Sequence, residues 1–259
     1  MSERLILVTN DDGIYTRGIL ELYRALEGLG ERIVVAPETE KSAVGHAITI
    51  SDPIKVRSVA RKDGFSGHAV GGTPADCVKL GVKALLKRRP DMIVSGINRG
   101  ANVGMSILYS GTVSAATEGV LLGIPSMAVS LDAWVDPEYS YAAKIARRFT
   151  EMVFAHGLPP GTALNVNVPG VPEEEIRGIR LTRQGMSYYE EDFDRREDPR
   201  QRTYYWMSGR MVKSGDDADC DDTALRNHFV SVTPLHYNLT HFDSLKALTL
   251  WDVFVNGKS

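Results

Sequence analysis

Residues 5–36 read LILVTNDDGIYTRGILELYRALEGLGERIVVA, and this stretch decides the fold class. Leu5 to Val8 is a short apolar run typical of a buried strand. Apolar residues at helical spacing come next, at Ile19, Leu22, Leu26 and Leu29. They predict a helix that stops at Gly30, and Arg32 to Ala36 then predicts a second strand. Strand, helix and strand in this order are typical of parallel strands joined by a crossover helix.

The same alternation continues through the first half of the chain. Further strands are predicted there at 92–94 and 126–130, with helices at 73–87 and 113–122. Later in the chain, a helix is predicted at 139–154, a strand at 229–235 and a helix at 244–251. Thr73-Pro74-Ala75-Asp76 is a helix start, because Thr73 can cap, Pro74 suits the first turn and Asp76 favours the positive end of the helix dipole. Residues 47–59 predict extended structure broken by Pro53 at a sheet edge. We therefore expect an α/β protein with a mostly parallel sheet and flanking helices.

The character of the sequence changes after Thr182. Residues 184–222 are dense in charge and carry Tyr188, Tyr189, Phe193, Tyr204, Tyr205 and Trp206. This composition predicts a protruding β-rich arm. Because the arm cannot bury these aromatic side chains within itself, we expect it to lie in an interface between subunits. The acidic run from Asp216 to Asp222 lacks the glycine and closing glutamate of an EF-hand, so we expect a solvated turn.

The domain division follows from this change. We predict one domain over residues 1–259, made of a core (1–183), a β-rich arm with a return strand (184–235) and a C-terminal segment (236–259). The chain is long enough to bury one large core without splitting into separately folding units.

Charge and composition exclude several classes of protein. The formal net charge is -3, which gives no general attraction to nucleic acid. No apolar run approaches a membrane span, and residues 1–7 lack the start of a secretion signal. The only cysteines, Cys77 and Cys220, have no zinc or redox spacing. We expect a cytoplasmic protein that needs neither a membrane nor nucleic acid.

Two adjacent carboxylates, Asp11 and Asp12, stand directly after the first strand. Ligands of open parallel sheets gather at the carboxyl ends of the strands. Neighbouring carboxylates repel each other unless a cation neutralises them, and Mg²⁺ and Mn²⁺ prefer such oxygen ligands. The alternative is a plain turn, because Asn, Asp and Gly are common turn residues.

Two further loops are expected at the same edge of the sheet. The loop Glu38–His46 can bring the hydroxyl of Ser42 toward the carboxylates. The loop Ser95–Gly104 offers Asn98 and Asn102 as neutral oxygens and amide donors, and its glycines permit close approach to a ligand. A flexible Gly/Asn turn is the alternative for the second loop.

A fourth segment, Tyr109-Ser110-Gly111-Thr112, opens a helix with hydroxyls and a glycine. Backbone N–H groups at a helix start form an anion site suited to phosphate, although Ser110 can equally act as a simple helix cap. No Walker motif is present, and no Gly-x-Gly-x-x-Gly follows the first strand, which disfavours ordinary nucleotide triphosphatases and dehydrogenases. The predicted phosphate and substrate residues are Asn10, Asn102, Ser110, Gly111 and Thr112. His46 is a candidate general acid, and the alternative is a hydrogen-bonded surface histidine.

Taken in order, these motifs resemble those of the SurE family, the stationary-phase survival protein nucleotidases. The matching segments are residues 8–13, 36–37, 42, 72–77, 95–98, 109–112 and 232–235. The resemblance implies a Rossmann-like core and a 5'- and 3'-nucleotidase with broad phosphatase tolerance. It implies one divalent metal ion per subunit, Mg²⁺ or Mn²⁺, bound by Asp11, Asp12, Ser42 and Asn98. It also implies a homodimer or homotetramer that exchanges the arm and the C-terminal segment.

The mechanism expected from this resemblance is metal-assisted hydrolysis of a nucleoside monophosphate by water, although either carboxylate could instead act as nucleophile or base. Two rival functions remain open at this point: a regulatory protein that binds metal or nucleotide without turnover, and a glycosyl-transfer enzyme. The residues leave open the preferred base, the native metal, activity on polyphosphate, and the choice between dimer and tetramer.

Overall fold

The computed structural model describes residues 4–62, 64–213, 215–251 and 253. The strands are β1 (Leu5–Thr9), β2 (Glu31–Pro37), β3 (Val56–Ala60), β4 (Ser66–Val70), β5 (Met92–Arg99), β6 (Ser126–Asp132), β7 (Ala163–Pro169), β8 (Gly178–Leu181), β9 (Tyr188–Glu197), β10 (Thr203–Val212) and β11 (Phe229–Leu235). The helices are α1 (Arg17–Ala25), α2 (Pro74–Leu80), α3 (Gly111–Leu121), α4 (Ser140–His156), α5 (Asp221–Arg226) and α6 (Phe242–Leu248).

A nine-stranded sheet forms the centre of the protein, in the order β3-β4-β2-β1-β5-β6-β7-β11-β8. The strands from β4 to β7 run parallel, and β3 and β11 each pair antiparallel with an inner neighbour. The buried strand β1 lies between β2 and β5, with Leu5 opposite Glu31 and Ile6 opposite Met92. This confirms the predicted α/β class with a mostly parallel sheet.

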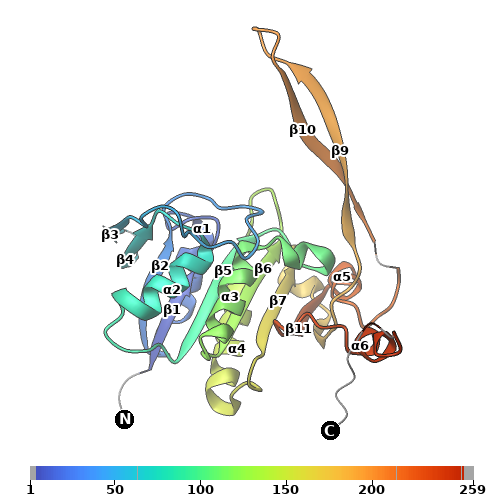
Figure 1. Ribbon diagram of the computed structural model, residues 1–259. Helices are drawn as coiled ribbons and strands as arrows, with labels where there is room; N and C mark the ends of the chain where they lie inside the picture. The colour runs from blue at the N-terminus through green and yellow to red at the C-terminus, as the bar shows by residue number, and fades with distance from the viewer. Residues whose placement is uncertain (1–3, 63, 214, 252, 254–259) are drawn as a thin grey trace.

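Helices cover both faces of this sheet (Figure 1). On one face α1 and α4 pack against alternate strand residues such as Ile6 and Val8 of β1. On the other face α2 and α3 pack against the intervening residues, such as Leu7. Because both faces are covered, residues on both faces of the inner strands are buried, and β1 and β2 are mostly apolar rather than alternating, as expected for a parallel sheet.

The start of α2 is the capping box that its sequence predicts. The hydroxyl of Thr73 accepts a hydrogen bond from the backbone N–H of Asp76 at 3.1 Å, and the Asp76 carboxylate accepts one from the N–H of Thr73 at 2.9 Å. The predicted helix was too long, because α2 ends at Leu80 and continues only as a wider turn over Gly81–Leu85.

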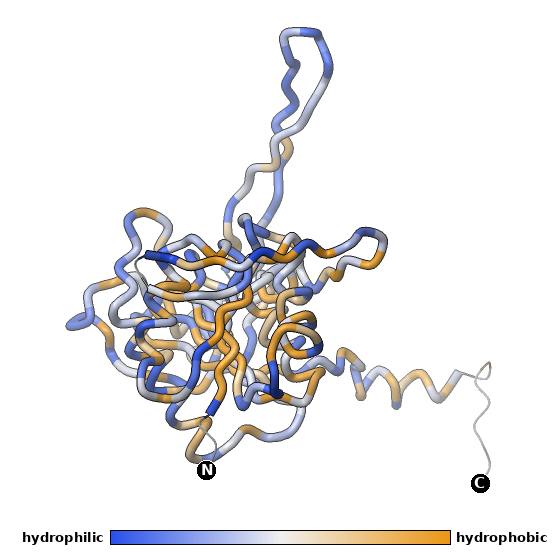
Figure 2. Tube along the Cα trace, turned by 90° about the vertical axis from the view of Figure 1, so that its left-hand side faces the viewer, coloured by the Kyte–Doolittle hydropathy of each residue, from blue (hydrophilic) through white to orange (hydrophobic). Residues whose placement is uncertain are grey.

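The arm is a long antiparallel hairpin of β9 and β10 that projects from the body of the protein (Figure 1). Nearly all of its residues are exposed, including Tyr205 at 58% and Trp206 at 60%. Helix α6 also leaves the body, and apolar residues lie along it (Figure 2). Its Phe242, Leu245 and Leu248 are exposed. Both segments therefore carry apolar side chains that no described residue of the same chain covers.

The acidic run at 216–222 is only partly the solvated turn that its composition predicts. Asp221 and Asp222 are buried at the start of α5. Asp221 accepts hydrogen bonds from the N–H groups of Gly104 and Gly185 at 3.0 and 2.8 Å. The prediction failed there because local composition does not show that a distant loop supplies donors.

Among the described residues, no helix combines the length and apolar character needed to cross a membrane.

Candidate metal and phosphate site

The predicted metal residues lie at the carboxyl ends of two neighbouring strands. Asp11 and Asp12 lie just after the end of β1 at Thr9, and Asn98 is the last residue but one of β5. The two strands pair in parallel with Thr9 opposite Ser95, so both segments emerge at the same edge of the sheet. This is the edge at which ligands of open α/β sheets bind.

Asp11 is buried, with 7% of its surface exposed, and the start of α3 holds its carboxylate. The backbone N–H of Thr112 donates to Oδ2 at 3.1 Å, and the Thr112 hydroxyl donates to Oδ1. Gly111 permits this approach, because a Cβ at that position would lie 2.8 Å from the Asp11 Cβ. The positive end of the helix dipole therefore faces a buried carboxylate.

Asp12 is partly buried and accepts a hydrogen bond from the backbone N–H of Arg99 at 3.3 Å. Burial, followed by the negative charge of Asp11, raises the pKa of Asp12 to about 6. Burial also raises the pKa of Asp11, against the hydrogen bonds from Thr112. The charge of Glu40 raises both values further. Two ionised carboxylates are thus unfavourable here without a cation.

This arrangement predicts how the metal-free protein responds to pH. Because the folded-state pKa of Asp12 lies above its ordinary value of 3.8, the folded state takes up the proton more readily than the unfolded state. Stability should therefore fall as pH rises from about 3.8 through about 6 and then level off, by about 1 to 2 kcal/mol in total after allowance for solvent screening. Urea unfolding in chelator measures this. In Asp12→Asn the pH dependence should be shallower; an identical slope in both proteins would contradict the assignment.

Ser42 and Asn98 lie on the two loops that flank the carboxylates. The Ser42 hydroxyl donates to Glu40 at 2.6 Å, and the neighbouring Lys41 N–H donates to the backbone oxygen of Asp11 at 2.8 Å. The side-chain nitrogen of Asn98 donates to the Gly100 carbonyl at 2.8 Å. Oδ1 of Asn98 accepts no hydrogen bond from the described residues and is thus a candidate ligand atom.

A bulge in β5 precedes Asn98. The pairing of β5 with β6 shifts register between Ser95 and Asn98. Gly96 has a φ of 136°, and a Cβ there would lie 2.3 Å from the backbone oxygen of Val129. Only glycine fits this position, and the bulge changes which residues of β5 reach the sheet edge.

The donor set fits a hard divalent cation. It combines two carboxylates with neutral oxygens from Asn98 and Ser42, which are ligand types that Mg²⁺ and Mn²⁺ accept. In the described part of the chain, no group of three or more His, Cys, Asp or Glu side chains is arranged to hold a metal. A site here depends on neutral oxygens and water in addition to Asp11 and Asp12.

The structure gives the five predicted phosphate residues different surroundings. Ser110 caps α3 by accepting from the N–H of Val113 at 3.1 Å, as the alternative interpretation holds. Gly111 and Thr112 contact Asp11, as described above. Asn10 is fully buried, and its side chain exchanges hydrogen bonds with the backbone of Gly13 at 3.0 and 3.2 Å.

Asn102 lies deeper than expected. Its side-chain nitrogen donates to the Ser130 hydroxyl at 2.8 Å, and its backbone N–H donates to Asn167 at 2.7 Å. The side chain of Asn165 donates to its carbonyl at 2.8 Å. These contacts fasten the loop after β5 to β6 and β7. The roles of Asn10 and Asn102 in substrate binding stay predictions.

A cavity of about 400 Å³ opens beside Asp12. It is lined by Asp12, Thr16, Arg17, Glu40, Arg99, Asp136, Pro137 and Tyr139. Apart from Asp12, these residues could not be grouped from sequence alone, because they come from four separate segments. Glu40 was also missed as a neighbour of the carboxylates, although it belongs to the loop that carries Ser42.

Comparison with known proteins shows which family this chain resembles over its length. The sequence profile of the family described as survival protein SurE matches residues 6–191. A protein named 5'-nucleotidase SurE from Syntrophobacter fumaroxidans is 51% identical over 96% of this chain and 99% of its own length. One of the same name from Syntrophus aciditrophicus is 48% identical over 93% of this chain and 91% of its own length. The crystal structure of the SurE protein from Aquifex aeolicus superposes with a TM-score of 0.82 at 41% identity, covering 95% of this chain and 98% of that one.

Proposed function

Because the chain belongs to the survival protein SurE family, we propose that it is a phosphatase that hydrolyses nucleoside 5'- and 3'-monophosphates to nucleoside and phosphate. The observation that carries the proposal is the pair Asp11 and Asp12 at the end of β1, with Asp11 held by the first turn of α3. The side chain of Asn10 makes the turn hydrogen bonds, so the turn does not need the two carboxylates, which supports a role for them beyond the turn.

We assign one divalent metal ion per subunit, Mg²⁺ or Mn²⁺, to Asp11, Asp12, Ser42 and Asn98. When bound, such an ion offsets the negative charge of the phosphate and activates water. Thr112 orients Asp11 and favours its ionised form, because it donates two hydrogen bonds to the carboxylate against the effect of burial, which raises the pKa of Asp11. Asp12 lines the adjacent cavity and faces the substrate from the same edge.

The cavity beside Asp12 is the proposed place for the rest of the nucleotide. Arg17 and Arg99 line it beside three carboxylates, Asp12, Glu40 and Asp136, so an anionic substrate would be favoured by the two arginines together with a bound cation. In the first turn of α3 the N–H groups of Thr112 and Val113 already donate to Asp11 and Ser110, so the proposed contact with the transferring phosphate oxygens falls to the N–H of Gly111. Water attack, or attack by a carboxylate of the pair, fits this placement equally.

A phosphate-release assay tests the function directly. Purified protein with Mn²⁺ should release phosphate from AMP and from 3'-AMP, and a panel with Mg²⁺, Mn²⁺ and Ca²⁺ ranks the metals. A protein that binds AMP but releases no phosphate would be a regulatory binding protein. Release of a free base without phosphate would support glycosyl transfer instead.

We also propose that the protein is a homodimer or homotetramer in which the hairpin and C-terminal segment are exchanged. The exposed Tyr205, Trp206 and Leu245 support this, because aromatic and apolar side chains are enriched in subunit interfaces. A cytoplasmic location stays a prediction from composition.

Sedimentation velocity at micromolar concentration should therefore show a dimer or tetramer. Replacing Trp206 by aspartate should lower the mass, because it places a charge in the proposed interface. The exposed Glu174 on the body of the protein provides a control, since Glu174→Lys should leave the mass unchanged. A compact monomer for the unmodified protein would refute the exchange.

A further inference from the structure

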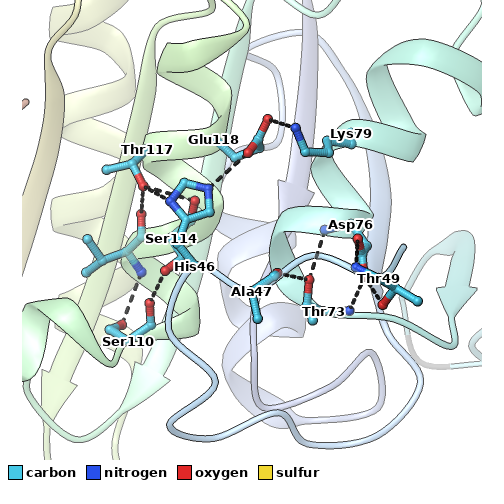
Figure 3. Close-up of polar contacts among 11 residues, drawn as sticks. His46, Ala47, Thr49, Thr73, Asp76, Lys79, Ser110, Ser114, Thr117 and Glu118 are labelled. Atoms are coloured by element: carbon cyan, nitrogen blue, oxygen red, sulfur yellow. Dashed lines mark hydrogen bonds and ion pairs between the residues drawn. The ribbon is translucent and has the colours of Figure 1, made fainter. Parts of the chain in front are cut away.

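Helix α3 carries a buried charge that the site described above does not use. Glu118 is 2% exposed, and a buried carboxylate is costly unless partners satisfy it. Oε1 lies 2.7 Å from Nζ of Lys79, and Oε2 lies 2.9 Å from Nε2 of His46 (Figure 3). Burial acts to raise the pKa of Glu118, but the hydrogen bonds from His46 and Lys79 outweigh it and hold the pKa below its usual value. The carboxylate is thus ionised, and Nε2 of His46 is the donor.

Both ring nitrogens of His46 are turned toward α3. Nδ1 lies 3.3 Å from the hydroxyl of Thr117, which also donates to helix carbonyls one turn back (Figure 3). A general acid must instead direct an N–H toward the leaving oxygen of the substrate. The contacts of His46 therefore favour a structural task over the predicted proton transfer.

The segment that carries His46 has no regular structure of its own. Between β2 and β3, residues 38–55 form neither helix nor strand, and this segment includes Ser42. Such a segment depends on individual contacts for its order. Three residues after Ser42, the N–H of Gly45 donates to the Tyr109 carbonyl at 3.0 Å.

Further along the segment, the start of α2 provides a second attachment. The hydroxyl of Thr73 donates to the carbonyl of Ala47 at 2.7 Å, and Thr49 donates to Asp76 through both N–H and hydroxyl at 3.0 and 2.6 Å (Figure 3). His46 and Glu118 are the side-chain link between this segment and α3.

We propose that Glu118 is a positioning residue, which through His46 holds the segment bearing Ser42 against α3 and so completes the metal site. The proposal rests on the proposed metal role of Ser42. Helix α3 then fixes both halves of the site. Thr112 in its first turn holds Asp11. Glu118 lies about 9 Å further along the helix axis and holds the loop through His46. Lys79 keeps the buried carboxylate charged.

Amide hydrogen exchange of the metal-free protein tests this without any activity. In Glu118→Gln and His46→Ala, residues 41–49 should exchange about 10-fold faster, which corresponds to loss of a hydrogen bond to a charged group. Strands β1 and β5 should keep their protection, which shows that the fold is intact. Glu174→Gln and His156→Ala change exposed residues of the same types and serve as controls. Unchanged exchange at 41–49 in both variants would overturn the proposal.

Calorimetric titration with Mn²⁺ alone gives the second measurement. Both variants should bind Mn²⁺ about 10-fold more weakly, while kcat for AMP at saturating Mn²⁺ stays within about 3-fold of the unmodified protein. The double variant should be no weaker than either single one, because the two side chains act through one contact. His46→Gln, which can still donate to Glu118, should restore part of the affinity.

The rival outcome is equally specific. If His46 is the general acid, His46→Ala should lower kcat by about 100-fold at saturating Mn²⁺ and leave Mn²⁺ affinity and exchange at 41–49 unchanged. That result would overturn the positioning role. If Mn²⁺ binds as expected but AMP is not hydrolysed by the unmodified protein, the proposed function fails while the exchange and affinity results still decide the role of Glu118.

Discussion

Replacing Asp12 by asparagine is expected to lower kcat/KM for AMP by about 10²- to 10³-fold, the usual cost of removing one group that stabilises transition-state charge. Asparagine keeps the size and turn propensity of aspartate and removes only the negative charge. The turn itself should persist, because its hydrogen bonds come from Asn10. Asp11→Asn should have an effect at least as large, since Asp11 is more deeply buried and accepts from Thr112 at two atoms.

The measurement is phosphate release at saturating Mn²⁺, together with thermal unfolding in chelator. Metal-free Asp12→Asn should be as stable as the unmodified protein or more stable, because the substitution relieves repulsion with Asp11. Asp52→Asn is a matched control, since Asp52 is exposed and does not line the cavity beside Asp12. An Asp12→Asn variant with unmodified turnover would show that the pair is only a turn and would refute the metal mechanism.

Removal of divalent metal is expected to abolish phosphate release, and addition of Mg²⁺ or Mn²⁺ should restore it. The physical reason is the raised pKa of Asp11 and Asp12, which marks a pair of carboxylates that a cation would stabilise. The protein is treated with chelator, dialysed, and assayed with AMP over a series of metal concentrations. Activity that survives chelation and dialysis would contradict the prediction.

Two variants distinguish the loss of a carboxylate ligand from the loss of a neutral ligand in this experiment. Asp12→Asn should remain almost inactive at every Mn²⁺ concentration, because a carboxylate ligand is missing. Asn98→Ala should recover activity at higher Mn²⁺, because water can replace a neutral ligand. An equal loss in both variants would mean that Asn98 contributes more than one neutral oxygen.

The sequence was sufficient for the parts of the fold with strong local signals. The apolar run of β1 and the capping residues Thr73 and Asp76 correspond to a strand and a helix start in the structure. Strands β4 and β7 were missed, because SGHAV and ALNVNVP contain small or polar residues that weaken the apolar pattern. In β7 the buried Asn165 and Asn167 bind the loop that contains Asn102, a partner that local sequence cannot reveal.

The residues of the site likewise divide into those that local sequence indicates and those that only the fold brings together. Asp11 and Asp12 could be singled out because two charges follow a buried strand. The contact of Asp11 with Thr112 spans 101 positions and depends on how α3 packs against β5 and β6, next to β1 in the sheet. Glu118 had one available signal, since it is the single charged residue in the otherwise small and apolar sequence of α3. A lone charge in a buried helix needs a partner, although the sequence does not name His46 and Lys79.

The hairpin also bears on how the chain can vary. It is an excursion inserted between β8 and β11, two strands that pair in parallel within the central sheet. The entropy lost in closing such an excursion grows only with the logarithm of its length, by about 0.6 kcal/mol for each doubling. The free energy of folding of the sheet therefore depends only weakly on the length of the arm. The arm can lengthen, shorten or diverge while the residues around Asp11 keep their geometry, so any subunit contact that the arm makes and the chemistry of this fold are free to evolve at separate rates.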